Sequence, residues 1–241
     1  MIKAVSFADV VVDTTPRESE PNERNSGRGT VIASAPYFGS NRAVQRGPQG
    51  FYVDFGPNFL IEPHFHRVDQ FQIVVRGFGS IGKHAMDPVT VHYTDGFTPY
   101  GPIVCGEEGM AFFNFRSHSD VGAYPMPASK DELERKAGRS RTEHTRCHLD
   151  GDNHTRMESL IDLTDDGLAA YEHVVAPGAN LPDEVVGGAC RYQLVIDGSL
   201  VVDDQDLPAR SAIFASAGEV LSHRRAGAGG LHLLQVQLPY A

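Results

Sequence analysis

The chain has 241 residues and a formal net charge of −10, from 31 acidic and 21 basic side chains. This length fits one large β domain or two domains of about 100–120 residues, and a hydrophobic fraction of 41% is sufficient for a core. The acidic balance argues against nucleic acid or an anionic membrane as a partner, because both require a positive surface.

The sequence also predicts no membrane-spanning helix. No apolar run approaches the ~20 residues that such a helix needs, and the N-terminus has no signal-peptide core. The three cysteines, Cys105, Cys147 and Cys190, are widely spaced and are interpreted as reduced thiols. We therefore expect a soluble cytoplasmic protein.

Residues 1–49 predict an arm with one short strand. Residues 5–12 are a strand candidate, whereas residues 14–27 are polar and have few groups that could form a core. We expect this polar stretch to be a loop or arm that packs over a neighbouring element.

The next segment places unusual polar groups on one face of a strand. His64 and His66 are two residues apart, and Gln70 and Gln72 share their parity. Side chains alternate across a strand, so all four point to the same side. Two imidazoles and two amides are costly to bury without a metal or a polar ligand.

Residues 93–102 form an aromatic stretch that is rich in turn residues. Structurally it is a tight, proline-stiffened loop between strands. Functionally, Tyr93 and Tyr100 are candidate catalytic residues, because a phenol at a pocket mouth can donate a hydrogen bond or transfer a proton.

The middle of the chain predicts a connector with a short surface helix. Ser129 and Glu132 have the spacing of a capping box, and Gly138 is a suitable end. The following polar stretch contains a further group of possible metal ligands, which are His144, Cys147, His148, Asp150, Asp152 and His154. Their spacing matches no common zinc pattern, and a solvated polar loop is the commoner outcome.

An internal repeat becomes visible when the sequence is shifted by 121 residues. Residues 71–77 then fall on 192–198, and residues 109–115 fall on 230–236. Each block is typical of a short buried strand bounded by glycine. The predicted organisation is an arm at 1–49, a first β unit at 50–126, a connector at 127–170 and a second β unit at 171–241.

The two copies differ where chemistry would occur. His64, His66 and Gln70 correspond to Val185, Gly187 and Arg191 in the second copy. We therefore expect the second unit to be a degenerate structural partner that has lost the polar inward face.

The spacing His64-x-His66-x-x-x-Gln70, with Gly77 after it, resembles the first motif of the cupin superfamily, with Gln where the family usually has Glu. The second family motif, Pro-x-Gly-x-x-His, survives as Pro99-x-Gly101 but has Val104 at the ligand position. From about residue 50 onward, the chain resembles a bicupin. That resemblance implies an all-β fold with two double-stranded β-helix (jelly-roll) units.

The resemblance implies one divalent metal ion held by His64, His66 and Gln70. For the missing ligand, strand alternation favours His92 over His84, and a core histidine bonded to a backbone carbonyl is an equally open interpretation of His92. The repeat partner of His92 is the apolar Ile213, which favours an inward position. Iron is the first choice, and zinc, manganese, nickel or copper are alternatives. Two other interpretations remain open: the histidines could be polar residues at a barrel mouth, and Gln70 could bind substrate or orient a histidine.

Gln72, Asn114 and Arg116 are the candidate substrate-binding residues. Arg116 would pair with a substrate carboxylate, although an exposed arginine at a strand end is the commoner case. The predicted function is a metal-dependent cupin enzyme acting on a small oxygen-bearing organic molecule, with dioxygenase-like chemistry. The alternatives are a non-redox isomerase, hydrolase or lyase, and a non-enzymatic small-ligand-binding cupin with a decayed metal site. A homodimer is expected, because a partner often covers jelly-roll edges.

Overall fold

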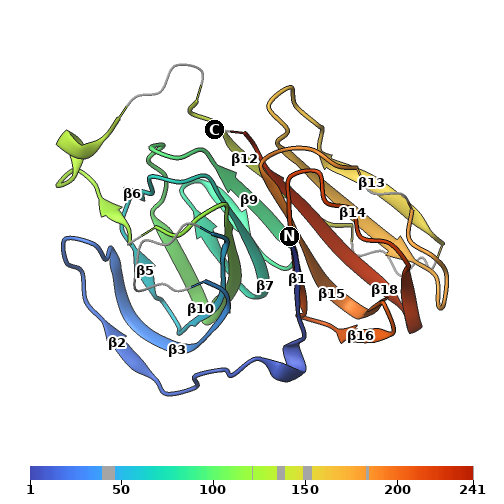
Figure 1. Cartoon of the computed structure of the whole chain (residues 1–241). Helices are drawn as coiled ribbons and strands as arrows, with labels where there is room; N and C mark the ends of the chain where they lie inside the picture. The colour runs from blue at the N-terminus through green and yellow to red at the C-terminus, as the bar shows by residue number, and fades with distance from the viewer. Residues whose placement is uncertain (40–46, 121, 135–138, 149–153, 183–184, 241) are drawn as a thin grey trace. The chain divides into compact units, whose positions relative to one another are not determined.

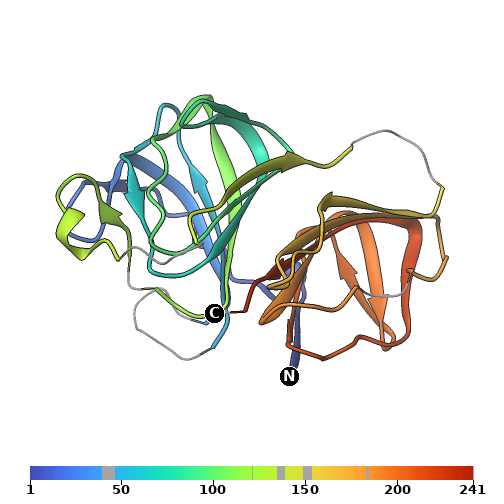
Figure 2. The ribbon, with the colours of Figure 1, turned by 90° about the horizontal axis from the view of Figure 1, so that it is seen from above.

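The computed structural model describes residues 1–39, 47–120, 122–134, 139–148, 154–182 and 185–240. These residues form an almost entirely β protein that divides into two compact units, Val11–Arg146 and Met1–Val10 with Cys147–Ala241. Figures 1 and 2 show each unit as its own set of curved strands. The predicted all-β, barrel-like fold is confirmed. Within the described residues, no helix is long and apolar enough to cross a membrane.

The N-terminal unit contains a large sheet with the path β12-β9-β7-β10-β4-β3-β2 and a small β11-β6 sheet. Two short strands lie off that path: β5 pairs with β10 and β3, and β8 pairs with β7. The bounds are β2 Arg17–Ser19, β3 Gly27–Phe38, β4 Gln49–Phe55, β5 Leu60–Ile61, β6 His64–Phe65, β7 Gln70–Ile81, β8 His84–Met86, β9 Thr90–Thr94, β10 Ile103–Arg116, β11 Tyr124–Pro125 and β12 Thr142–Arg146.

The C-terminal unit contains a sheet with the path β1-β17-β15-β18-β14-β13, in which β16 also pairs with β15. Its elements are β1 Ile2–Val5, a 3₁₀ turn η1 Phe7–Asp9, β13 Arg156–Ile161, β14 Ala169–Val175, β15 Cys190–Val202, β16 Gln205–Pro208, β17 Ala212–Ser216 and β18 Arg224–Leu238.

Strand pairing divides the chain differently from the boundaries that the sequence predicts. The first strand, β1, pairs antiparallel with β17, so the start of the chain belongs to the C-terminal unit (Figure 1). Conversely, β12 lies in the predicted connector but pairs with β9 of the N-terminal unit. Pairing partners this distant in sequence leave no local pattern, because hydrogen bonding between strands depends on the assembled sheet.

The repeat at 121 residues is present in the strands themselves. Adding 121 to the bounds of β7, β9 and β10 gives 191–202, 211–215 and 224–237, which nearly reproduce β15, β17 and β18. The pairing is also repeated, because β7 lies between β9 and β10 just as β15 lies between β17 and β18. The same strand framework therefore occurs in both units.

Alternation divides the interior of the N-terminal unit into a polar and an apolar end. On β7, Gln70 and Gln72 share a face with Val74, and on β10, Arg116 and Asn114 share a face with Phe112. The apolar end joins an aromatic core cluster that includes Phe55, Phe59 and Phe112. The polar end holds the residues that the sequence singled out.

The prediction that the second unit has lost its polar inward face is wrong, because its interior contains polar side chains. Arg191, Gln193, Gln235 and Gln237 are all buried there, and Arg191 lies opposite Gln237 in the strand register. In the N-terminal unit Gln70 lies opposite Arg116, so the two copies carry an Arg–Gln pair on exchanged strands. The second copy therefore lacks the two imidazoles of the first copy, but its interior still contains polar side chains.

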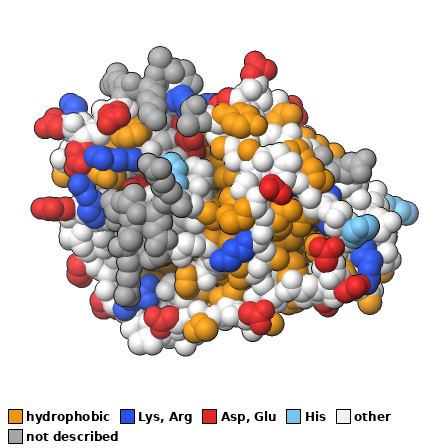
Figure 3. All heavy atoms as spheres, in the orientation of Figure 1, with side chains coloured by type: hydrophobic (Ala, Val, Ile, Leu, Met, Phe, Trp, Pro, Cys, Tyr) orange, Lys and Arg blue, Asp and Glu red, His pale blue; other side chains and the backbone are white. Residues whose placement is uncertain are grey.

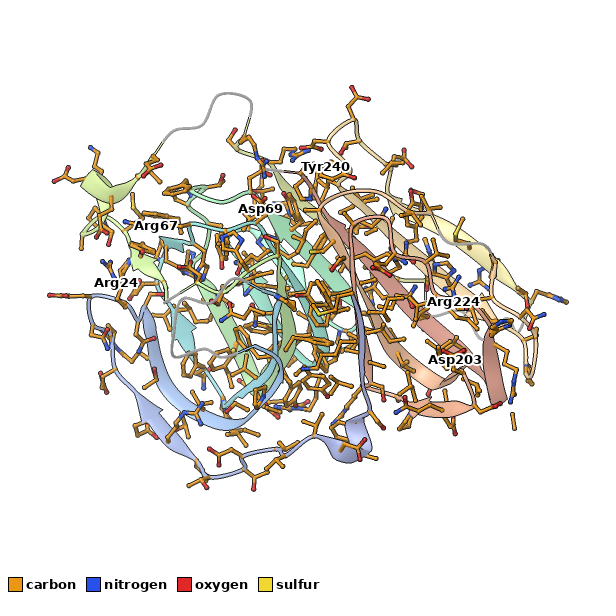
Figure 4. All side chains as sticks on the ribbon, viewed as in Figure 1. Arg24, Arg67, Asp69, Asp203, Arg224 and Tyr240 are labelled. Atoms are coloured by element: carbon orange, nitrogen blue, oxygen red, sulfur yellow. The ribbon has the colours of Figure 1, made fainter. Side chains whose placement is uncertain are left out.

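The predicted helix at 129–138 is also wrong for its described part. Residues Lys130–Glu132 form only a 3₁₀ turn, η2, and Ser129 makes no side-chain capping hydrogen bond. Glu132 instead bonds Arg24 and Arg67, which Figure 4 labels on neighbouring parts of the N-terminal unit. Residues 135–138 lie outside the described residues. On the face drawn in Figure 3, acidic and basic side chains are interspersed and form no large basic patch.

A matched pair of glycine substitutions tests the structural repeat. Gly77 and Gly198 have φ angles of +71° and +70°, and an added Cβ would lie 2.1 Å from the carbonyl oxygen of Gly109 or Gly230, respectively. We expect Gly77→Ala and Gly198→Ala each to lower the free energy of unfolding by about 2–4 kcal/mol, from the left-handed conformation and the steric clash together. Urea unfolding of the purified variants measures this.

Gly178→Ala is the control, because its φ is +69° but no atom lies within 4 Å of the added Cβ. It should cost only about 1–2 kcal/mol. Equal losses in the control and in Gly198→Ala would show that the close backbone approach contributes nothing.

Candidate functional site

Five side chains from separate segments meet at the polar end of the N-terminal barrel. His64 lies in β6, His66 follows it, and Gln70 begins β7. Tyr100 is paired directly with His64 through two backbone hydrogen bonds, and Arg116 ends β10 opposite Gln70. All five are buried, with exposed fractions between 0% and 8%.

The orientation of His64 follows from its neighbours. Its Nδ1 lies 2.8 Å from the carbonyl oxygen of Glu62, which can only accept, so Nδ1 carries the proton. Nε2 therefore accepts from the Tyr100 hydroxyl at 2.9 Å. That hydroxyl in turn accepts from the amide nitrogen of Gln70. The phenol of Tyr100 thus bridges the imidazole and the amide.

Arg116 is the cation of the site. Its Nε and Nη2 donate to the amide oxygen of Gln70 at 3.0 and 2.9 Å, and Nη1 donates to Gln49 Oε1 at 2.9 Å. Nη2 also lies 3.1 Å from His66 Nε2. A guanidinium has no acceptor, so the lone pair of His66 Nε2 receives this hydrogen.

The other ring nitrogen of His66 faces a carboxylate. Its Nδ1 lies 3.0 Å from Asp120 Oδ2, which also accepts the backbone N–H of Arg67 at 3.1 Å. His66 therefore stands between a guanidinium and a carboxylate as a neutral imidazole with a fixed tautomer.

Burial determines the protonation of these groups. Desolvation and the neighbouring His66 lower the pKa of His64 to about 3, and desolvation and the Arg116 charge lower the pKa of His66 to about 4. Burial raises the pKa of Tyr100. Although burial alone would raise the pKa of Asp120, hydrogen bonding from His66 lowers it overall. At neutral pH the site therefore holds neutral imidazoles, a neutral phenol, one cation and one carboxylate.

A cavity of about 340 Å³ adjoins this group, at the small end of the size range of small-molecule sites. Its polar lining is Arg17, Ser19, Arg24, Asn25, Ser26, Gln49, His64, His66, Gln72, Tyr100, Asn114, Arg116 and Asp120. Its apolar lining includes Phe51, Val53, Phe55, Phe59, Ile61 and Phe112. Arg17 and Arg24 have side chains that are 50% and 42% exposed, so the cavity reaches the surface at their end.

The amide oxygen of Gln72 is buried and has no hydrogen-bond partner among the described residues. Gln72 lines the cavity opposite Asn114, two residues along the same strand face from Gln70. A buried, unsatisfied acceptor is costly. The cavity is therefore lined by the guanidinium of Arg116 and by the amide oxygen of Gln72, which can accept a hydrogen bond. The two residues are separated by about 7 Å in the strand direction.

The structure brings together most of the predicted site residues. His64, His66, Tyr100, Gln72, Asn114 and Arg116 line the cavity, and Gln70 is directly behind them. Arg116 is 5% exposed and is not the exposed strand end that was the commoner alternative.

Tyr93 requires correction, because it does not belong to this group. It lies opposite Phe71, and alternation points both away from the face that carries Gln70 and Gln72. Its hydroxyl donates instead to Asp95 Oδ1 at 2.6 Å. Alternation could have excluded Tyr93, because it follows the inward-facing His92 on the same strand, whereas Tyr100 could be placed only by its pairing with β6.

His92 is fully buried opposite Gln72, as the apolar repeat partner indicated, but it does not line the cavity. Its ring lies 5.2 Å from that of Tyr100 and 4.5 Å from that of His144. His84 is exposed and stacks on His144 at 3.8 Å. Val104, the expected ligand position, is 39% exposed, and Tyr100 is the residue that faces His64 instead.

A divalent cation does not fit the site as its side chains are arranged. The lone pairs that a metal would need are engaged: His66 Nε2 and Gln70 Oε1 by Arg116, and His64 Nε2 by Tyr100. A metal bound to His66 would lie beside a guanidinium, and the donor set contains no carboxylate to offset that repulsion. Asp120 is on the far side of His66.

Two participants were not found from the sequence. Gln49 and Asp120 lie 67 and 54 residues from their partners Arg116 and His66. Neither belongs to a recognisable motif, so only the folded arrangement identifies them.

No family model and no curated protein matches the chain. Among solved structures, it is similar to oxalate decarboxylase of Bacillus subtilis, studied for its Mn(II) centres, at 11% identity, covering 98% of this chain and 77% of that one with a TM-score of 0.61. It is also similar to the pirin of Escherichia coli in complex with nickel(II), at 9% identity, covering 100% of both chains with a TM-score of 0.58.

A third similar structure is a Nostoc punctiforme protein provisionally named a dioxygenase, at 11% identity, covering 99% and 83% of the two chains with a TM-score of 0.59. At these identities the likeness establishes the fold. The chain therefore shares the barrel-like β fold of these three proteins.

The depressed histidine pKa values predict an acid-sensitive stability. The pKa values of His64 and His66 are about 3 and about 4 in the folded protein, below the 6.5 of the unfolded chain. Between pH 4 and 6.5 the unfolded state binds more protons, so stability is lost as pH falls. At pH 5 the two groups together contribute a slope of about two protons.

We expect the double variant His64→Gln/His66→Gln to lose this slope of about two protons, whatever its absolute stability. Urea unfolding of both proteins at a series of pH values from 5 to 7 provides the measurement. An unchanged slope would mean that the imidazoles are already protonated in the folded barrel.

Proposed function

We propose that the N-terminal barrel binds a small organic acid without a metal, with Arg116 as the group that recognises the carboxylate. The observation that carries this proposal is the buried guanidinium that lines the cavity and donates to the neutral acceptors Gln49, Gln70 and His66. A carboxylate that replaced one of these neutral acceptors would gain a charge-assisted hydrogen bond. A buried guanidinium is well suited to bind a planar carboxylate. This is the small-ligand-binding alternative among the functions that the sequence allowed.

The lining of the cavity narrows the ligand class. Among the described residues, none donates a hydrogen bond to Gln72 Oε1, which favours a ligand with a hydroxyl or amino group. Phe51, Phe55 and Phe112 line the apolar side and favour a hydrocarbon or aromatic body. A carboxylic acid with a nearby hydroxyl or amino group and an apolar body satisfies all three features.

The protonation states favour binding over proton-transfer chemistry. The pKa values of His64 and His66, at about 3 and about 4, make both imidazoles weak bases. The pKa of Tyr100 is raised by burial, so its hydroxyl donates a hydrogen bond and keeps its proton. An efficient general acid or base has a pKa near the working pH.

Mandelate is a suitable probe, because it combines a carboxylate, an adjacent hydroxyl and a phenyl ring. We expect it to bind about 10–100-fold more tightly than the neutral mandelamide, since the guanidinium–carboxylate bond is lost in the amide. Phenylacetate, which lacks the hydroxyl, should bind about 3–10-fold more weakly than mandelate. Isothermal titration calorimetry measures the three affinities.

Two variants test the role of Arg116. Arg116→Gln removes the cation, and Gln70→Glu supplies a carboxylate that pairs with Arg116 in place of the ligand. Both should reduce mandelate affinity by at least about tenfold, whereas Arg146→Gln, an exposed arginine of the same unit, should leave it unchanged. Retained binding in Arg116→Gln would disprove the proposal.

The metal-dependent enzyme that the resemblance implies is the second candidate. The observation that favours it is the pair of buried imidazoles, His64 and His66, with Tyr100 beside them. Metal binding would require the Arg116 guanidinium to move away from His66 Nε2. The expected dioxygenase-like or Lewis-acid chemistry depends on this movement.

Metal analysis of the untagged protein distinguishes the two candidates. One equivalent of metal in wild type that is absent from a folded His64→Ala/His66→Ala variant would favour the enzyme. Mandelate binding that is unaffected by a chelator would favour the metal-free proposal.

A further inference from the structure

The C-terminal unit brings together three side chains of different metal-binding types. Cys147 directly follows β12, Glu172 lies in the middle of β14, and His232 lies in β18. The Cys147 thiol sulfur, a Glu172 carboxylate oxygen and a His232 ring nitrogen all lie within 4.8 Å of one another. Cys147 and Glu172 are each only 1% exposed. The sequence grouped Cys147 with other residues of a polar stretch, and its actual neighbours come from strands that begin more than 20 residues later.

Strand register explains why Glu172 and His232 meet. β14 pairs with β18 so that Glu172 is opposite Leu234 and Val174 is opposite His232. The two side chains are diagonal neighbours on one face of the sheet, and His232 Nε2 lies 2.7 Å from Glu172 Oε1. Val175 and Leu233, of opposite parity, belong to the apolar core cluster of this unit. The three-residue cluster is therefore on the outer face of the sheet, outside the barrel interior.

A second carboxylate increases the negative charge beside this cluster. Glu158 of β13 is directly opposite Glu172, and like charges at such a position repel. His148 lies between them, with Nδ1 3.1 Å from Glu158 Oε2 and 3.2 Å from Glu172 Oε2. Arg156 Nε also bonds Glu158 at 2.9 Å. This arrangement favours an additional positive charge next to Glu172.

We propose that Cys147, Glu172 and His232 bind one divalent cation of the zinc class, with His148 as the fourth ligand. A thiolate, an imidazole and a carboxylate are the ligands that zinc takes in proteins. The thiolate and the Glu172 carboxylate carry two negative charges, which match the charge of the cation. The His148 side chain is 60% exposed, so this ligand is accessible to an ion from solvent.

This cluster meets the conditions that the N-terminal barrel does not. The barrel donors are neutral and share their hydrogen bonds with a guanidinium. In the cluster of the C-terminal unit, the thiol of Cys147 and the carboxyl of Glu172 are both anionic once deprotonated. None of its three residues is an arginine. Binding would release the thiol proton, so affinity should rise with pH. The proposal is independent of the organic acid site, because the two sites share no residue.

Cobalt(II) titration of the untagged full-length protein provides the test, because a cysteine ligand produces a sulfur-to-cobalt charge-transfer band in the near ultraviolet. We expect one equivalent of cobalt, this band, and visible bands of tetrahedral intensity. Cys147→Ser should abolish the near-ultraviolet band. In competition with a chromophoric chelator, Cys147→Ser, Glu172→Gln and His232→Gln should each weaken zinc binding by at least about tenfold.

Two controls locate the ion. Cys190→Ser removes another buried thiol of the same unit and should retain the band and the zinc affinity. His64→Ala/His66→Ala removes the barrel imidazoles and should also retain both. Zinc binding that is lost in the barrel variant but retained in Cys147→Ser would overturn the proposal, as would a wild type that binds zinc no more tightly than Cys147→Ser.

A measurement on unmodified protein covers the case in which the variants fail to fold. Zinc-edge X-ray absorption of the wild-type complex should show one sulfur and about three nitrogen or oxygen neighbours. A coordination shell without sulfur would refute the site.

Discussion

The buried guanidinium of Arg116 determines the chemistry of the N-terminal barrel. Its hydrogen bonds include those to Gln49, Gln70 and His66, and the other ring nitrogen of His66 faces Asp120. A guanidinium can only donate, so each acceptor around it has a fixed orientation. The same charge, together with burial, keeps the pKa of His66 low. A pair of imidazoles that resembles a metal site is thereby held neutral and occupied with hydrogen bonds.

The second barrel helps to separate structural from functional features. An Arg–Gln pair lies at the corresponding end of both interiors, on exchanged strands, as Gln70 with Arg116 and as Arg191 with Gln237. A buried Arg–Gln pair on two neighbouring strands is therefore a feature of the repeated fold. The N-terminal unit differs in that its pair contacts His66 and Tyr100 and adjoins a cavity. Function is inferred from that difference, because a fold supports many functions.

Charge distinguishes the two proposed sites. In the barrel, the cation belongs to the protein, and the complementary ligand is an anion. Around Glu172, the protein supplies the negative groups, and the complementary ligand is a cation. The net charge of −10 for the whole chain predicts neither preference, because buried groups respond to their immediate neighbours more than to distant, screened charges.

The sequence by itself determined the all-β class, the repeat of the buried strands and the polar face of β7. Alternation places Gln70 and Gln72 on one side of β7 because it is a property of the local backbone, whereas His64 and His66 lie in and just after β6, so the expected single strand is interrupted at 66–69. Only the tertiary structure decided which side chains these groups contact: Arg116 beside His66, Tyr100 rather than Val104 facing His64, and Glu172 beside Cys147. Such pairs join residues 25 to 50 positions apart through strand register. Register is set by the packing of the whole sheet, which no local pattern records.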